Sequence, residues 1–360
     1  MPDKKRRILI APLDWGLGHT TRCIPIIISL LRHDCEVFVA AEGPSKELLK
    51  NEFPELIFLE LKGYRVQYSQ KRRWMFLKLA FQVPKLIFQV FSEHSWLGRV
   101  GNKYNFDAVI SDNRPGLYHK SIPSVYMTHQ LCIKTGNSLT DKLVQKIHYH
   151  FINKFSQCWV PDASGELSLA GDLSHPLIFP TLPVKYIGPL SRFERKAIPA
   201  KYSLSIILSG PEPQRSVFEN IVLKYLENYS GCVLLVRGLP GNSELIPGHS
   251  SFIEIENHLS SAELSKAIQE SELIIARCGY STVMDLIKLG KRAVLIPTPG
   301  QTEQEYLAKY LMEKNLFYCV DQAQFSLNEA IDKAGVFPFV EQALFQHEYE
   351  NVLKDFINRL

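Results

Sequence analysis

The chain has 360 residues, of which 46% are hydrophobic and 22% are charged, and its formal net charge is +4. These values are typical of a soluble protein with two ordinary domains, and the weak positive charge gives no reason to expect nucleic acid as a partner. No apolar run reaches the roughly 18 to 20 residues of a membrane span. The basic start of the chain is followed by Asp14 and glycines instead of an apolar signal core, so we expect a cytoplasmic protein.

The cysteines and acidic residues show no pattern of a metal site. Seven cysteines are scattered along the chain without a C-x-x-C pair, and no D-x-D triplet occurs. A disulfide framework or a zinc site would need closely spaced cysteines. We therefore expect no metal and no other resident cofactor.

A glycine-rich turn follows the first predicted strand, at residues 7–12, and leads into an apolar helix. The turn reads G-x-G-H, with Gly16, Gly18 and His19. Glycines allow the backbone to approach a ligand closely, but the third glycine of a dinucleotide fingerprint is missing. The imidazole has an unperturbed pKa near 6.5, which makes His19 the first candidate for a general base. The alternative is that His19 only caps the helix.

The segment at residues 63–103 differs in composition from its neighbours. It follows predicted strands at 35–40 and 56–60 and contains eight Lys or Arg residues, a single acid, Glu93, and six Trp or Phe residues. A basic and aromatic helix of this kind suits peripheral contact with an anionic membrane surface. A helix packed on its own sheet, with a solvated basic face, is an equally good interpretation.

Two further strands, predicted at 108–111 and 123–127, end in polar residues. Asp112 follows the first of them and His129 follows the second. The carboxyl ends of parallel strands meet at one edge of a sheet, so we expect both residues near the Gly16–His19 turn. They are reserve candidates for acid/base groups, and the alternative is that they are structural turn residues.

The first half of the chain ends near residue 200, and the pattern of strands and turns then starts again. A helix at 139–155 and strands at 157–160 and 184–187 complete the first half, and Arg192 follows the last strand. Residues 191–200 are polar and charged and are expected to form a linker. The second half opens with a strand at 204–208, followed by a turn into a helix that contains Ser209, Gly210 and Arg215.

The stretch at 271–310 is the most informative part of the chain. Strands predicted at 273–276 and 293–296 are each followed by a turn and a helix, with Ser281 or Thr282 as the expected N-cap of the first helix and Gly290 at its end. Helix N-termini at the carboxyl edge of a parallel sheet present free N–H groups to anionic ligands. An ordinary βαβ unit is the alternative. The polar residues at these turns nevertheless favour a nucleotide site: Arg277, Ser281, Thr282, Asp285, Gln301, Glu303, Gln304 and Glu305.

The same stretch resembles the donor-binding half of GT-B glycosyltransferases, in particular family 28. That family has an R-x-G-x-x-T-x-x-E-type helix, a G-x-P-x-x-x-x-P turn and a glutamine-rich turn. The matching positions in this chain are Arg277, Gly279, Thr282, Asp285, Gly290, Pro297, Gln304 and Glu305. Asp285 stands where the family has the glutamate that holds the ribose. Glu305 stands where it has a second glutamine, which leaves the identity of the sugar open.

The resemblance implies an α/β protein of GT-B fold, with two Rossmann-like, doubly wound parallel-sheet domains that face a cleft. Residues 1–195 would bind the acceptor, residues 196–345 the nucleotide sugar, and a helix at 346–360 would cross back to the first domain. Residues of both halves would contact the donor, with Arg192 near its phosphates: Gly16, Gly18, Arg192, Ser209, Gly210, Arg215 and the motif residues given above.

The implied reaction moves a hexose or N-acetylhexosamine from a UDP-sugar to an acceptor hydroxyl, with inversion and without a metal. A lipid-linked acceptor would place the protein at the inner face of the plasma membrane. Two other functions are open on the same fold. One is a nucleotide-sugar epimerase or hydrolase, and the other is a non-catalytic subunit that binds nucleotide sugars.

Overall fold

The computed structural model describes residues 5–65, 72–135, 138–241, 252–340 and 348–360. Within the helix that begins at Arg72, it describes the side chain of Gln82 and those from Pro84 onward. The chain divides into two compact units. The first is formed mainly by the residues up to Arg192 together with the last helix, and the second by the residues from Phe193 onward.

The first unit is built on a seven-stranded parallel sheet with the strand order β3-β2-β1-β4-β5-β6-β7. Its strands are β1 Arg7–Pro12, β2 Glu36–Ala41, β3 Ile57–Glu60, β4 Ala108–Asp112, β5 Ser124–Met127, β6 Gln157–Val160 and β7 Val184–Tyr186. Its helices are α1 Leu17–Arg32, α2 Gly43–Glu52, α3 Arg72–Tyr104, α4 Ser138–Ile152 and α10 Glu348–Ile357, and it also contains the short 3₁₀ turns η1 Gly165–Leu167 and η2 Gly171–Leu173.

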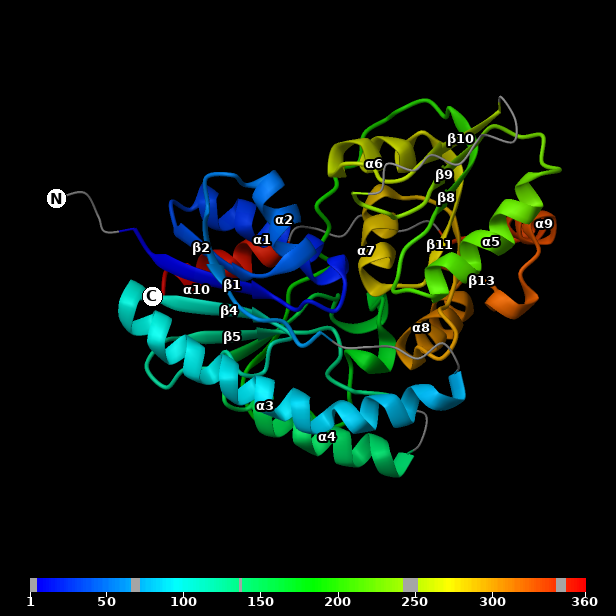
Figure 1. Cartoon of the computed structure of the whole chain (residues 1–360). Helices are drawn as coiled ribbons and strands as arrows, with labels where there is room; N and C mark the ends of the chain where they lie inside the picture. Colours follow the sequence, from blue (N-terminus) through cyan, green and yellow to red (C-terminus); the bar gives the residue numbers. More distant parts are fainter. Residues whose placement is uncertain (1–4, 66–71, 136–137, 242–251, 341–347) are drawn as a thin grey trace. The chain divides into compact units, whose positions relative to one another are not determined.

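Helices cover both faces of this sheet, α1 and α10 on one face and α3 and α4 on the other (Figure 1). The central strand β1 is therefore buried on both faces, and Ile8, Leu9 and Ile10 are completely inaccessible. Such continuous apolar runs are typical of parallel strands between two helical layers. The last helix belongs to this unit, because the ring of Phe356 packs edge-on against Trp159 with a centroid distance of 5.4 Å.

The second unit is built on a six-stranded parallel sheet with the order β10-β9-β8-β11-β12-β13. In Figure 1, α6 and α7 lie on one face of it, and α5 and α9 on the other. Its strands are β8 Tyr202–Ile207, β9 Val233–Val236, β10 Ile253–Glu256, β11 Ser271–Arg277, β12 Ala293–Ile296 and β13 Tyr318–Cys319. Its helices are α5 Gln214–Leu226, α6 Ser261–Gln269, α7 Tyr280–Leu289, α8 Thr302–Glu313 and α9 Leu327–Val336, with the 3₁₀ turn η3 Gln322–Gln324.

Both sheets reverse their strand order next to the first strand. In the first unit β1 pairs with β2 on one side and with β4 on the other, and Pro12 lies opposite Asp112 at the carboxyl ends. In the second unit β8 pairs with β9 and β11 in the same way. Open α/β sheets bind ligands at the carboxyl ends of the strands beside such a reversal. The loops after β1, β4, β8 and β11 are therefore where a site is expected.

The predicted parallel sheets and their strands are confirmed, and the differences are local. The N-cap of α7 is Gly279, with no side-chain cap, so the prediction of Ser281 or Thr282 at this position is wrong. Gly290 does end this helix, in a left-handed conformation with φ of 64°. Residues 346 and 347, with which the predicted helix at 346–360 begins, lie outside the described residues. Within the part that is described, no helix is long and apolar enough to cross a membrane.

Candidate active site

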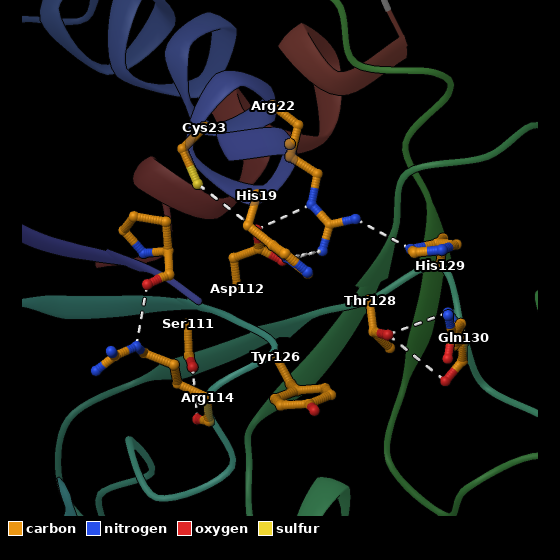
Figure 2. A network of polar contacts seen from close by, with 12 residues as sticks. His19, Arg22, Cys23, Ser111, Asp112, Arg114, Tyr126, Thr128, His129 and Gln130 are labelled. Atoms are coloured by element: carbon orange, nitrogen blue, oxygen red, sulfur yellow. Dashed lines mark hydrogen bonds and ion pairs between the residues drawn. The ribbon is translucent and has the colours of Figure 1, made fainter. Parts of the chain in front are cut away.

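The turn after β1 requires glycine at one position. Gly16 is the N-cap of α1 and has a φ of 107°, which disfavours side chains with a Cβ atom. A Cβ atom at this position would meet nothing within 4 Å, so the need for glycine is conformational. Gly18 lies within the first turn of α1, where its carbonyl accepts a hydrogen bond from Thr21 Oγ1 at 3.1 Å. The turn places His19 at the start of α1, pointing toward the end of β4 (Figure 2).

His19 and Asp112 are in contact, as Figure 2 shows. His19 Nδ1 lies 3.1 Å from Asp112 Oδ2, and the Asp112 side chain is completely buried while that of His19 is 16% exposed. Among the residues that the structure describes, no hydrogen bond occupies the other ring nitrogen, Nε2. A histidine held through Nδ1 by a carboxylate can accept a proton at Nε2. The two predicted acid/base residues, His19 of α1 and Asp112 of β4, therefore lie together in the geometry of a base and its orienting group.

An arginine that the sequence analysis did not single out completes the cluster. Arg22 follows His19 by one helical turn and is only 2% exposed. Its Nε donates to Asp112 Oδ2 at 2.9 Å, and Nη2 contacts Asp112 Oδ1. Nη2 also lies 2.9 Å from His19 Nδ1. The i, i+3 spacing of the two residues on α1 was the available signal, because residues three apart lie on one face of a helix.

His129, the third predicted acid/base residue, belongs to the same cluster. It is buried after the end of β5, and Arg22 Nη1 lies 3.0 Å from its Nδ1. A guanidinium only donates hydrogen bonds, so Nδ1 of His129 is the acceptor and carries no proton. The neighbouring Thr128 Oγ1 accepts from the backbone N–H of Gln130 at 3.0 Å and so stabilises the turn that holds His129.

The charges of this cluster set its proton affinities. Burial and then the positive charge of Arg22 lower the pKa of His19 below its usual value, although Asp112 acts in the opposite direction. Burial disfavours the charged form of Asp112, but the charge of Arg22 and the hydrogen bonds outweigh it, so the pKa of Asp112 is also lowered. At neutral pH the cluster therefore contains a neutral His19, an ionised Asp112 and a charged Arg22.

A second buried network is built around Arg114, which follows β4. Arg114 is completely buried, donates to the Pro12 carbonyl at 3.0 Å and lies 3.1 Å from Glu93 of α3. Tyr64 donates to Glu93 at 2.7 Å. Burial is the largest influence on Glu93 and raises its pKa to about 7. The single acid of the basic segment at 63–103 is thus an internal group that fixes α3 to the loops around β1 and β4.

In the second unit, Arg215 belongs to an ion-pair network at the start of α5. Its guanidinium is 6% exposed and contacts Glu212 at 2.6 Å and Glu219 at 3.0 Å. Glu219 in turn accepts from Arg237, which follows β9 and donates to Asn257 at 2.7 Å. Ser209 and the positive-φ Gly210 form the turn before this network. The connection between Glu219, Arg237 and Asn257 was not predicted, because it depends on the pairing of strands and not on a local pattern.

Arg277, one of the residues predicted to bind the donor, lies inside the second unit. It is 2% exposed, and its guanidinium lies over the ring of Phe218 at 4.5 Å. Nη2 donates to the Gln214 carbonyl at 2.8 Å, and Nη1 lies 3.5 Å from the Pro297 carbonyl. Burial lowers the pKa of Arg277 to about 10. These contacts connect the end of β11 with the start of α5 and with the turn after β12.

The polar residues of α7 share one side of the helix. Ser281, Thr282 and Asp285 are half-buried, whereas Val283, Met284, Leu286 and Ile287 are buried against the sheet. The N-terminus of α7 directs its free N–H groups to the same edge of the sheet. These polar residues lie next to the β8–β11 reversal, where a ligand would meet hydroxyl groups, a carboxylate and backbone N–H groups.

The glutamine-rich turn is organised by its own side chains. Gln304 Oε1 accepts from the Thr298 N–H at 2.8 Å, and its Nε2 donates to Gln301 at 2.6 Å. Glu305 accepts from the Gly300 N–H at 2.8 Å. These bonds fix the turn from β12 into α8 at the carboxyl edge of the sheet. Arg192 stands at the end of the first unit and is half-buried.

A groove of about 660 Å³ opens beside this turn, between α8, β13 and α9. Of the predicted donor residues, Glu305 lines it, together with the motif residue Pro297. The remaining lining was not predicted from the sequence and includes Lys309, Cys319, Asp321, Glu329 and Lys333.

The helices α3 and α4 carry exposed apolar side chains, and we call this part of the molecule the α3–α4 surface. Phe151 of α4 and Leu86 of α3 pack on the same buried cluster, so the two helices are neighbours. Its apolar side chains are Ile87, Phe88, Phe91, Leu143 and Ile147, with exposed fractions of 45% to 73%. The exposed lysines Lys85, Lys142 and Lys146 accompany them. Within the 63–103 segment, the side chains of residues 66–81 and 83 are not described.

Comparison with known proteins gives matches in both units. Residues 249–349 match the glycosyltransferase family 28 C-terminal domain. A stretch of 67 residues is 37% identical to the UDP-N-acetylglucosamine--N-acetylmuramyl-(pentapeptide) pyrophosphoryl-undecaprenol N-acetylglucosamine transferase of Rickettsia massiliae (strain Mtu5), and it spans 18% of this chain and 18% of that protein. An uncharacterized glycosyltransferase of Methanosarcina acetivorans is 22% identical over 86% of this chain and 84% of its own length.

Solved structures match the whole chain. The glycotransferase of kitacinnamycin superposes with a TM-score of 0.72 at 13% identity, over 99% of both chains. MurG of Acinetobacter baumannii superposes with a TM-score of 0.58 at 14% identity, over 99% of this chain and 100% of its own. At this level of identity the likeness shows the fold, which is the fold that these transferases share.

Proposed function

We propose that this chain, a GT-B glycosyltransferase with a family 28 C-terminal domain, transfers a hexose or N-acetylhexosamine from a UDP-sugar to an acceptor hydroxyl, with inversion and without a metal. The observation that carries the proposal is the His19–Asp112 contact of 3.1 Å at the strand-order reversal of the first sheet. It supplies a neutral imidazole with one nitrogen held and the other available. The chemistry of sugar transfer needs such a base next to the acceptor.

In the proposed reaction, Asp112 accepts a hydrogen bond from the Nδ1–H group of His19 and so orients the ring. Nε2 takes the proton of the acceptor hydroxyl while that oxygen attacks the anomeric carbon of the donor. The bond between the anomeric carbon and the UDP oxygen breaks, and UDP leaves with the electron pair. One displacement on the face opposite the leaving group inverts the anomeric centre. Asp112 also stabilises the imidazolium that forms.

The second unit would hold the donor. We assign the ribose hydroxyls to Asp285, because a carboxylate accepts two hydrogen bonds, and the phosphates to the N-termini of α7 and α8. Helix N-termini and arginine side chains, Arg192 among them, can stabilise the charge on the leaving UDP without a metal. The relative from Rickettsia is named for the transfer of N-acetylglucosamine, which supports an N-acetylhexosamine among the donors to be tested.

We further propose that the acceptor is lipid-linked and that the α3–α4 surface contacts an anionic bilayer. Exposed aromatic and aliphatic side chains beside lysines are the features that place a helix in the headgroup region. Phe88, which is 73% exposed, and Phe91, which is 57% exposed, would enter the bilayer first. This contact would hold the protein at the inner face of the plasma membrane.

The test begins with a panel of nucleotide sugars, each measured for thermal stabilisation of the full chain, because a ligand that binds only the folded state must stabilise it. The best donor is then incubated with candidate acceptors, and the products are analysed. A glycosylated acceptor of inverted configuration supports the proposal. Sugar released or isomerised without an acceptor would indicate a hydrolase or epimerase. Binding without any turnover would indicate a non-catalytic subunit.

A further inference from the structure

We infer that Arg22 is the positioning residue of the catalytic cluster. Its guanidinium balances the charge of Asp112 and sets the hydrogen-bond partners of both His19 and His129. The catalytic consequence rests on the proposed function, whereas the proton positions can be measured on the protein alone.

The geometry shows a guanidinium with every nitrogen directed at the cluster. Nε and Nη2 contact the two oxygens of Asp112, Nη1 lies 3.0 Å from His129 Nδ1, and Nη2 lies 2.9 Å from His19 Nδ1 (Figure 2). Arg22 is 2% exposed, and its carboxylate partner is completely buried. A buried charge without a partner is costly, so the two charges of this pair depend on each other.

Arg22 fixes the proton of His129. Because a guanidinium has five N–H donors and no acceptor, the 3.0 Å contact requires a lone pair on His129 Nδ1. His129 is therefore a neutral imidazole with its proton on Nε2, which makes it a hydrogen-bond donor at that atom. It cannot serve as a base there while Arg22 holds Nδ1, and His19 is left as the base of the cluster.

Both Arg22 and Asp112 contact the Nδ1 atom of His19. Nδ1 either donates to Asp112 or accepts from Arg22, and only the first arrangement leaves a lone pair on Nε2 for the acceptor proton. A carboxylate alone beside an imidazole stabilises the imidazolium, which cannot accept a proton. The positive charge of Arg22 offsets that effect. Arg22 thus keeps His19 in an unprotonated form at neutral pH while Asp112 keeps the ring oriented.

The charged and titratable groups that face His19 are few in the described structure. Arg22 comes from α1, Asp112 from β4 and His129 from the turn after β5. Cys23 lies next to Asp112, with its Sγ 3.9 Å from Oδ2, and burial keeps its pKa high, so it stays a neutral thiol. Removal of the Arg22 charge therefore leaves Asp112 as the dominant charge near His19.

The experiment measures the imidazole nitrogens by ¹⁵N NMR as a function of pH. Wild type, Arg22→Gln and Arg22→Lys are compared, and His19→Gln and His129→Gln identify two of the eleven histidines. In the wild type we expect His129 to carry its proton on Nε2. In Arg22→Gln the titration of His19 should move upward by at least about one pH unit, since a cation in contact has been removed. Arg22→Lys should keep the titration of His19 low but lose the preference of His129 for one tautomer.

Arg32→Gln is the matched control, because it removes the same charge from the exposed end of the same helix and should leave both histidines unchanged. A wild-type His129 with its proton on Nδ1, or an unchanged His19 titration in Arg22→Gln, would overturn the inference. If Arg22→Gln does not fold, the wild-type tautomer and Arg22→Lys still decide it. If the chain proves to have no transferase activity, these measurements retain their meaning, so the two failures are distinguishable.

Discussion

Arg22 and Asp112 form a buried ion pair between the first helix and the fourth strand, with Nε and Oδ2 2.9 Å apart across 90 residues of sequence. Neither side chain is exposed beyond 2%. The pair lies at the strand-order reversal of the first sheet, because β1 and β4 are adjacent there and α1 follows β1. It is at once a structural connection and the electrostatic centre of the proposed active site.

The first prediction concerns the stability that this pair contributes. Asp112→Asn keeps the shape of the side chain but leaves the charge of Arg22 buried without a counter-charge. Breaking a buried pair in this way costs about 3–5 kcal/mol in the free energy of unfolding, which denaturant titration measures. The control is Asp34→Asn, in an ion pair with Lys5 on the surface, which should change stability little. Equal effects of the two substitutions would contradict the account.

The second prediction is a pH dependence of turnover. Burial and Arg22 lower the pKa of His19, so the proton leaves at a lower pH than from an ordinary imidazole. The active, unprotonated form therefore predominates at all pH values above the usual histidine pKa near 6.5, and kcat/KM should fall only below it. Measurement of kcat/KM from about pH 4 to 9 tests this prediction, and the acid limb of the profile should lie below about pH 6.5. An acid limb above that value would show that the base is another group or that Arg22 does not act as described.

The third prediction concerns the donor. Asp285→Ala should weaken UDP binding by about 1–3 kcal/mol, because the ribose hydroxyls lose a charged acceptor. Isothermal titration of the full chain with UDP provides the measurement. Asp332→Ala removes the same charge from an exposed position on α9 and serves as the control. Wild-type affinity in Asp285→Ala would place the ribose elsewhere.

Much of this architecture could be predicted from the sequence because its signals are local. Buried strands such as Arg7–Pro12 and Ala293–Ile296 are short apolar runs bounded by turn residues, and they lie where they were predicted. Helix α6 was not predicted, although Ser260 and Glu263 form a capping box that a sequence reader can recognise.

The cluster around His19 could be predicted only in part. His19, Asp112 and His129 follow strand ends, and the order of parallel strands brings such residues to one edge. The role of Arg22 could not be predicted in the same way, since an arginine on an apolar helix is usually a surface residue and its partners come from β4 and β5. The burial of Arg277 over Phe218 likewise depends on how α5 packs on the sheet, which no local pattern reports.

The fourth prediction concerns the membrane contact of the α3–α4 surface. The full chain should sediment with anionic vesicles at low salt and less at high salt, because salt screens the lysines. Phe88→Ser combined with Phe91→Ser should reduce this binding, since both side chains are exposed and apolar. Phe252→Ser, which removes an equally exposed phenylalanine outside this surface, is the control. Equal sedimentation with anionic and neutral vesicles, or none with either, would leave a solvated helix face as the interpretation.

The turnover number of His19→Ala tests the central claim most directly. The account predicts that kcat falls by roughly 100- to 10,000-fold, the usual contribution of an acid–base group, while the affinity for UDP changes little because the donor residues lie mainly in the second unit. His33→Ala, at the other end of α1, should keep the wild-type kcat. A folded His19→Ala variant that retains the wild-type kcat with the same donor and acceptor would contradict the assignment of His19 as the base.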